Sequence, residues 1–217
     1  MSAIILCSIY LQAQGTSFGL RAGVNFQNIN GKELDGDDLK NDMLIAYHIG
    51  VNAEIPIAPE FYFQPGLLFT VKGAKNEEVI LTETFNSSVK ISYIELPLNF
   101  LFKPMLGNGH LLLGAGPYVA YGIGGKYNRE GGGITLNQDV EFKNNVTISD
   151  IDNDVSYFRA LDAGANLLAG YEFSNRVSFQ LNAQLGLIDI NSEYDFIVDD
   201  KTSSKNTGFG MSLGYRF

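Results

Sequence analysis

The sequence is poor in cysteine, histidine and basic residues, and it has no tryptophan. Cys7 is the single cysteine, so no internal disulfide can form. Only 15 Lys and Arg stand against 24 Asp and Glu, which gives a formal charge of −9. Phosphate binding requires a basic face, and this balance argues against a nucleic-acid partner.

A long hydrophobic run is also missing, since no stretch reaches the roughly 18 to 20 apolar residues that a spanning helix needs. The N-terminal segment MSAIILCSIYLQAQG is apolar and ends at Ala13-Gln14, as in the h-region and cleavage site of a secretory signal. No Lys or Arg precedes it, so we expect the true start to lie upstream. We predict a signal peptide over residues 1–14, which would remove Cys7, and one β-barrel domain over residues 15–217; a short strand or tail is the alternative for 1–14.

The abundant residues favour β structure: 24 glycines, 11 tyrosines and 15 phenylalanines. Apolar and polar or small residues alternate with a period of two, which is typical of a strand with unlike faces. In the final segment, Phe209, Leu213 and Phe217 share one face, and glycines and Arg216 share the other. The same alternation occurs in segments 18–27, 45–55, 61–72, 92–103, 110–124, 161–173, 177–187 and 208–217.

The connections between these segments alternate between long and short. The long ones cover about residues 28–44, 73–89, 124–157 and 189–206, and the short ones lie near 56–60, 103–109 and 174–176. Most of the acidic residues fall in the long connections, and the apolar faces carry no charge. We predict an all-β fold: an eight-stranded antiparallel up-and-down transmembrane β-barrel in the bacterial outer membrane, with periplasmic termini and acidic loops outside.

An eight-stranded barrel has an interior that side chains can fill. We therefore predict a structural polar network in the lumen, made by Arg21, Glu54, Tyr93, Glu95, Tyr118, Asp162, Glu172 and Arg216. A proton path, a gate or a substrate slot is the functional alternative for the same residues.

Catalytic and metal-binding patterns are scarce. His48 lies on a predicted inward face, where a hydrogen-bonded structural histidine is favoured over a catalytic one, and His110 opens a strand beside a short turn. Asp150, Asp152 and Asp154 have the spacing of a calcium loop, but Val155 replaces the glycine that the loop requires. We expect no catalytic residues, no metal and no cofactor.

The segment SYIELPLNFLFK, with Tyr93, Glu95 and Pro97, resembles the Tyr-Leu-Glu-Ile-Pro-Leu signature of the PorT-like outer-membrane β-barrel proteins of Bacteroidetes-type bacteria. GAGPYVAYGIGGK, DAGANLLAGYEF, LGLIDI and the terminal GYRF resemble later strands of that family. The resemblance implies insertion by the barrel-assembly machinery, for which Tyr215 and Phe217 would form the C-terminal assembly signal. It implies no established activity for this chain.

These observations favour a small integral outer-membrane protein with a structural or interaction role and outer-membrane lipid as its surroundings. The alternative is an accessory component of protein secretion or transport across the outer membrane, with a secretion-system or extracellular partner. A barrel-rim enzyme and a soluble lipocalin-like binder are less favoured.

Overall fold

The computed structural model describes residues 15–80, 82–152, 154–197 and 201–217, and the predicted signal peptide over 1–14 lies outside these residues. Eight long strands form the body of the molecule. They are β1 (Ser17–Lys32), β2 (Leu44–Ala58), β3 (Phe61–Ile80), β4 (Glu83–Phe102), β6 (Gly109–Gly131), β10 (Leu161–Glu172), β11 (Val177–Gly186) and β13 (Ser203–Arg216).

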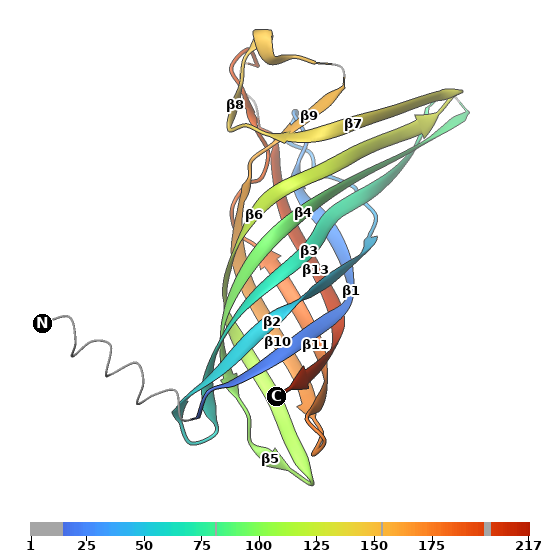
Figure 1. The fold of residues 1–217 in the computed structure, drawn as a ribbon. Helices are drawn as coiled ribbons and strands as arrows, with labels where there is room; N and C mark the ends of the chain where they lie inside the picture. Colours follow the sequence, from blue (N-terminus) through green and yellow to red (C-terminus); the bar gives the residue numbers. More distant parts are fainter. Residues whose placement is uncertain (1–14, 81, 153, 198–200) are drawn as a thin grey trace, which may run out of the picture.

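The eight strands close into a ring in which every neighbouring pair is antiparallel (Figure 1). The first strand pairs with the last, from Gly19 opposite Arg216 to Lys32 opposite Ser203. β6 and β10 are direct neighbours in the ring, although the segment that joins them in the sequence leaves the ring. The predicted eight-stranded antiparallel up-and-down barrel is confirmed.

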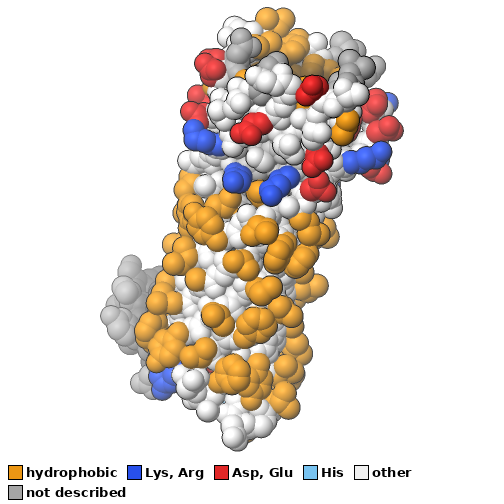
Figure 2. Space-filling view, turned by 90° about the vertical axis from the view of Figure 1, so that its right-hand side faces the viewer, with side chains coloured by type: hydrophobic (Ala, Val, Ile, Leu, Met, Phe, Trp, Pro, Cys, Tyr) orange, Lys and Arg blue, Asp and Glu red, His pale blue; other side chains and the backbone are white. Residues whose placement is uncertain are grey.

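The two faces of the wall are those that the alternation predicts. Large apolar side chains such as Leu20, Leu167 and Leu213 point outward with 52%, 62% and 64% of their surface exposed. A band of such side chains covers the face of the barrel that Figure 2 shows, and most of the charged side chains in this view gather beyond its upper end. Polar and ionisable side chains fill the inside, where Glu54, Glu95 and Asp162 are at most 1% exposed. Water would not favour this arrangement, but hydrocarbon does.

The two ends of the barrel differ. We call the end that carries the long connections the loop end, and the end where β1 begins, β13 ends and the tight connections lie the turn end. At the turn end, β2 and β3 are joined through Glu60 in a left-handed conformation with φ 65°, and β10 and β11 through Arg176 with φ 67°. β5 (Met105–Leu106) makes a small hairpin with the start of β6.

Three strands continue past the loop end, where the sequence predicts irregular connections. β3 and β4 stay paired up to Ile80 opposite Glu83, and β6 pairs with β7 (Ile134–Phe142) up to Gly131 opposite Ile134. Gly132 and Gly133 make the second turn with φ of 56° and 76°, a region that glycine adopts without steric cost. The prediction of connections over residues 73–89 and 124–157 is therefore corrected: much of both is strand, and the hairpins project beyond the barrel (Figure 1).

The remainder of the 124–157 connection folds over the mouth of the barrel. β7 pairs in parallel with β9 (Val155–Phe158), and β8 (Asn145–Val146) pairs with β12 (Glu193–Tyr194). Val140 from β7 and Ile190 pack against the inward-facing Ile29 and Ile91 in one apolar cluster, with Phe142 and Phe158 at its side. We call this cluster the cap. Gly122 makes room for it, because a Cβ there would lie 2.4 Å from the Phe142 ring.

Within the described ranges, no helix has the length and the apolar character needed to cross a membrane.

Candidate functional site in the barrel interior

The charged side chains inside the barrel form two clusters at different heights. The loop-end cluster is centred on Lys72 of β3, whose Nζ lies 2.8 Å from Glu95 Oε2 and 3.0 Å from Asp162 Oδ2. The contact with Glu95 is an ion pair without hydrogen-bond geometry, whereas Lys72 donates a hydrogen bond to Asp162. The ammonium also lies 4.0 Å from the centre of the Tyr118 ring and 5.6 Å from that of Tyr93, within the range of cation–π attraction.

Neutral side chains add further hydrogen bonds to this cluster. The Tyr118 hydroxyl donates to Asp162 at 3.3 Å, and Asn206 Nδ2 donates to Asp162 Oδ2 at 3.0 Å. On the other carboxylate, Gln184 Nε2 donates to Glu95 Oε1 at 2.7 Å. The side chains come from β3, β4, β6, β10, β11 and β13, so the cluster ties most of the ring together across the lumen.

The turn-end cluster is centred on Glu54 of β2. Lys103 Nζ lies 2.9 Å from Glu54 Oε2 and 2.8 Å from Glu172 Oε1. The Arg216 guanidinium pairs with the other oxygen of Glu54, to which Gln64 also donates at 3.1 Å. Leu101, Leu112 and Leu168 form a small apolar layer in the lumen, with Tyr62 packed against it.

Between the clusters, uncharged side chains form a continuous chain of hydrogen bonds around His48. Its Nδ1 lies 2.9 Å from Asn25 Oδ1, and its Nε2 lies 2.9 Å from Ser212 Oγ. Asn25 uses its amide nitrogen to donate to Thr70, and Asn182 donates to Ser212. These hydrogen bonds are mutually consistent when His48 is neutral and carries its proton on Nδ1, so that Nδ1 donates to Asn25 and Nε2 accepts from Ser212. A serine and an amide on the two ring nitrogens match the order of a hydrolytic triad, but the three side chains are buried inside the barrel.

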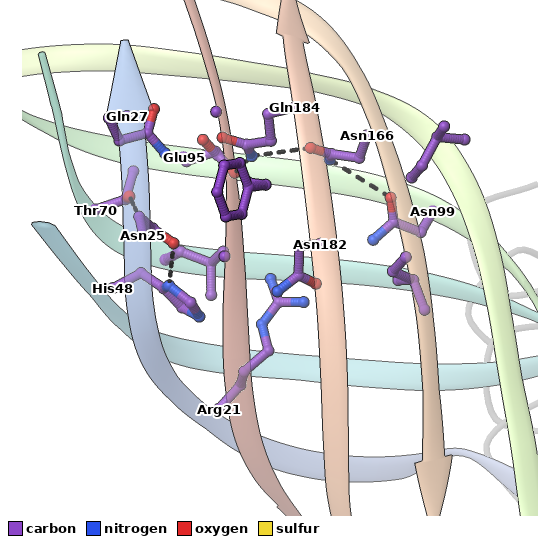
Figure 3. Close-up of a pocket in the computed structure, with 16 residues that line it drawn as sticks. Arg21, Asn25, Gln27, His48, Thr70, Glu95, Asn99, Asn166, Asn182 and Gln184 are labelled. Atoms are coloured by element: carbon purple, nitrogen blue, oxygen red, sulfur yellow. Dashed lines mark hydrogen bonds between the residues drawn. The ribbon is translucent and has the colours of Figure 1, made fainter. Parts of the chain in front are cut away.

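Arg21 lies in the same middle region and points into a small cavity (Figure 3). The cavity has a volume of about 30 Å³ and is lined by Arg21, Asn25, His48, Glu95, Asn166 and Asn182, among others. A space of about 10 to 15 Å³ on this measure is enough for one water, so the cavity has room for about two waters and none for an organic substrate. Arg21 makes no ion pair with the residues that the structure describes, and its Nε has no hydrogen-bond partner among them.

All eight residues of the predicted lumenal network are buried inside the barrel. The structure brings Glu95, Asp162, Tyr93 and Tyr118 together in one cluster and Glu54, Glu172 and Arg216 in the other, and it leaves Arg21 between them. The sequence interpretation missed Lys72 and Lys103, which are the central cations. Both lie on predicted inward faces, and this was the signal that could have identified them.

The buried charges of the described interior balance. Four cations, Arg21, Lys72, Lys103 and Arg216, accompany four carboxylates, Glu54, Glu95, Asp162 and Glu172. The attraction between buried ions of opposite charge offsets part of the desolvation penalty that burial imposes on each of them. The arrangement thus holds the strands together across the lumen and fills the space that a pore would need.

The other residues considered in the sequence take no part in the two ion clusters. His110, half-buried near the start of β6, lies opposite Met105 of β5 and Glu172 of β10. Asp150 lies in the η2 turn (Ile148–Asp150) of the long connection, where its carboxylate pairs with Lys143 at 2.5 Å. In the part of the chain that the structure covers, no group of acidic, histidine or cysteine side chains has the arrangement of a metal site. Tyr215 and Phe217 face outward at the turn end, with their rings 5.4 Å apart.

A closed ring of eight antiparallel strands with an apolar outer band and a polar interior defines an integral outer-membrane β-barrel protein. The model of the family described as outer membrane protein beta-barrel domain matches residues 12–192, and the chain belongs to this family. The protein is therefore a bacterial outer-membrane β-barrel protein.

Solved structures with a similar fold share little sequence with this chain. The attachment invasion locus protein Ail of Yersinia pestis, solved with the heparin analogue sucrose octasulfate, is 12% identical with a TM-score of 0.42, and the match covers 93% of this chain and 99% of Ail. The Neisserial surface protein A is 12% identical with a TM-score of 0.45, and the match covers 94% of this chain and 100% of that one. A search of curated proteins gives no match.

Proposed function

We propose that this protein is a small structural or interaction barrel of the outer membrane, whose lumen is closed by its own side chains and whose loop end meets external partners. The observation that supports a closed lumen is the combination of the two ion clusters with a cavity of only about 30 Å³ between them. The cap adds an apolar layer over the mouth. A hydrated ion or a solute has no continuous path through such an interior.

We further propose that the loop end faces the exterior and that both termini lie in the periplasm. Long connections at one end and tight turns at the other are the pattern of outer-membrane barrels, in which the turns are periplasmic. The acidic side chains of the loop end lie beyond the apolar band, so this end meets water outside the hydrocarbon (Figure 2).

The finer family assignment that we propose is PorT-like, on the resemblance of Tyr93, Glu95 and Pro97 and their neighbours to that signature. In the barrel, Tyr93 and Glu95 point inward and take part in the loop-end cluster. For assembly, we propose that the barrel-assembly machinery recognises the last strand, where Tyr215 and Phe217 are exposed on the outer face.

The proposed closed lumen is tested by conductance in planar lipid bilayers. We expect the purified protein to insert without discrete current steps. Tyr93 and Tyr118 are the two largest fully buried side chains, so the double variant Tyr93→Ala/Tyr118→Ala should open a path and produce current. The matched control is Tyr47→Ala/Tyr121→Ala, which removes two tyrosines from the lipid face and should stay silent.

Steady conductance of the unmodified protein would contradict the proposal. In that case the same interior would be a functional path, and the secretion or transport alternative would be favoured.

A further inference from the structure

A row of lysines lies where the apolar band of the barrel ends. On five strands, a lysine is the first charged side chain that points outward between the band and the loop end: Lys32 on β1, Lys75 on β3, Lys90 on β4, Lys126 on β6 and Lys205 on β13. We call these five residues the basic belt. Figure 2 shows blue side chains along the upper margin of the apolar band, with most of the red ones farther from it. The belt is notable in a chain with a formal charge of −9.

Three members of the belt lie close together on neighbouring strands. Lys90 is directly opposite Lys126 in the register of β4 and β6, and Lys75 is one diagonal step away because its partner on β4 is Ser88. Like charges directly opposite each other destabilise a sheet unless something neutralises them. Lys126 has Asp139 at 2.5 Å, but the side chains of Lys75 and Lys90 form no ion pair with the residues that the structure describes.

The surroundings of Lys75 and Lys90 fit a headgroup with hydroxyl groups. A polar hollow of about 410 Å³ begins at Lys75 and continues away from the band. Amides and hydroxyls line it together with three carboxylates, so it suits the uncharged hydroxylated part of a headgroup and leaves the phosphate to the lysines: Asn76, Asn86, Ser87, Ser88, Asn128, Asp42, Glu77 and Glu130. Amides and hydroxyls of this kind can donate to and accept from a sugar or glycerol. The position is also the height at which the phosphates of a surrounding lipid lie, just beyond its acyl chains.

We infer that Lys75 and Lys90, together with Lys126, bind the phosphate of an anionic lipid of the surrounding leaflet, with the lipid's hydroxylated headgroup in the adjoining polar hollow. The acyl chains of that lipid lie along the apolar band below. This inference gives the proposed lipid surroundings a specific contact site, and it does not depend on whether the lumen conducts.

The test is a titration of the purified full-length chain in detergent micelles, with the retained lipid counted by native mass spectrometry. Phosphatidylglycerol is the anionic probe and phosphatidylcholine the zwitterionic one. A lysine near an anionic membrane surface contributes about 1 kcal/mol, and 1.4 kcal/mol corresponds to a tenfold change, so Lys75→Gln/Lys90→Gln should weaken binding of phosphatidylglycerol about thirty-fold. Lys75→Arg/Lys90→Arg keeps the charge and should retain the binding.

The matched control is Lys40→Gln/Lys201→Gln, which changes the net charge equally at exposed positions outside the belt and should bind as the unmodified chain does. Inorganic phosphate at the same concentration should not displace the lipid, because it lacks the acyl chains. Equal retention of the two lipids, an equal loss in the control variant, or full competition by inorganic phosphate would each overturn the inference. Conductance measured on the same sample tests the proposed function separately.

Discussion

Removal of the central cation of the loop-end cluster should destabilise the barrel strongly. Lys72→Met keeps most of the volume of the side chain but leaves Glu95 and Asp162 without the ammonium that lies 2.8 and 3.0 Å from them. All three side chains are at most 1% exposed, so water cannot replace the lost partner. Breaking a buried ion pair by removing one partner typically costs about 3 to 5 kcal/mol, and we expect a loss of this size in the free energy of unfolding.

The measurement is equilibrium unfolding by urea or guanidinium from lipid vesicles. The chain has no tryptophan, so the folded fraction is followed by the altered gel mobility of the unboiled barrel. The double variant Lys72→Met/Asp162→Asn removes one charge of each sign and should recover part of the lost stability. Recovery would show that the unpaired carboxylate, and not the lost packing of the lysine stem, is responsible.

Lys126→Met is the matched control. Its ion pair with Asp139 is shorter, at 2.5 Å, but both side chains are about two-thirds exposed, at 67% and 69%. An exposed pair is screened by water and contributes little. Burial, not distance, should therefore decide the outcome: equal losses for Lys72→Met and Lys126→Met would refute the reasoning.

Two further predictions concern the long connection over the mouth. Gly122→Ala places a Cβ 2.4 Å from the Phe142 ring, so the ring must move and the cap should loosen. Amide hydrogen exchange at Val140 should then rise several-fold while the barrel strands stay protected. Unchanged exchange at Val140 would contradict this packing. The Lys143 ammonium and the Thr147 hydroxyl and amide hold the pKa of Asp150 well below its usual range. A lowered pKa means that the contact is fully stabilising above the ordinary value of about 3.9 and is lost as the pH falls through the folded value. Hydrogen exchange of the Thr147 amide, corrected for its intrinsic rate, should therefore be constant from about pH 5 to 8 and rise only in stronger acid. Asp150→Asn should lack this rise in acid. A change in the exchange rate near neutral pH would contradict the lowered pKa of Asp150.

The wall of the barrel was predictable from sequence because the membrane imposes one simple rule on every spanning strand. Outward side chains meet hydrocarbon and inward ones meet a narrow polar lumen, so the alternation around Leu20, Leu167 and Leu213 identifies both the strand and its outer face. Leu101 is an instructive exception. It interrupts the alternation of β4, yet it points inward and belongs to the apolar layer of the lumen.

The rule fails beyond the membrane, where both faces of a strand meet water. β3 and β4 stay paired beyond Lys75 and Ser88, but the sequence between these residues has no consistent apolar face. The alternation that identifies a strand is therefore absent from this part of the sequence. The cap was also not predictable, because Val140 and Ile190 are single apolar residues in polar surroundings that meet only in three dimensions.

The interior was predictable by face but not by height. Alternation shows that Arg21 and Lys72 both point inward, but it does not show which carboxylates of other strands lie at the same level. That level depends on the stagger between strands around the closed ring. The predicted network therefore did not include Lys72 and Lys103, although both lie on inward faces.

The seam between β1 and β13 places Gly19 opposite Arg216, so the first and the last strand are neighbours in the finished sheet. Nothing can complete the cylinder until the last strand has been synthesised and delivered. A chain that lost this strand would present two rows of unsatisfied amides and carbonyls, on β1 and β11, to the acyl chains around it. The barrel therefore closes only when β13 (Ser203–Arg216) is in place, and the other seven strands depend on it for closure.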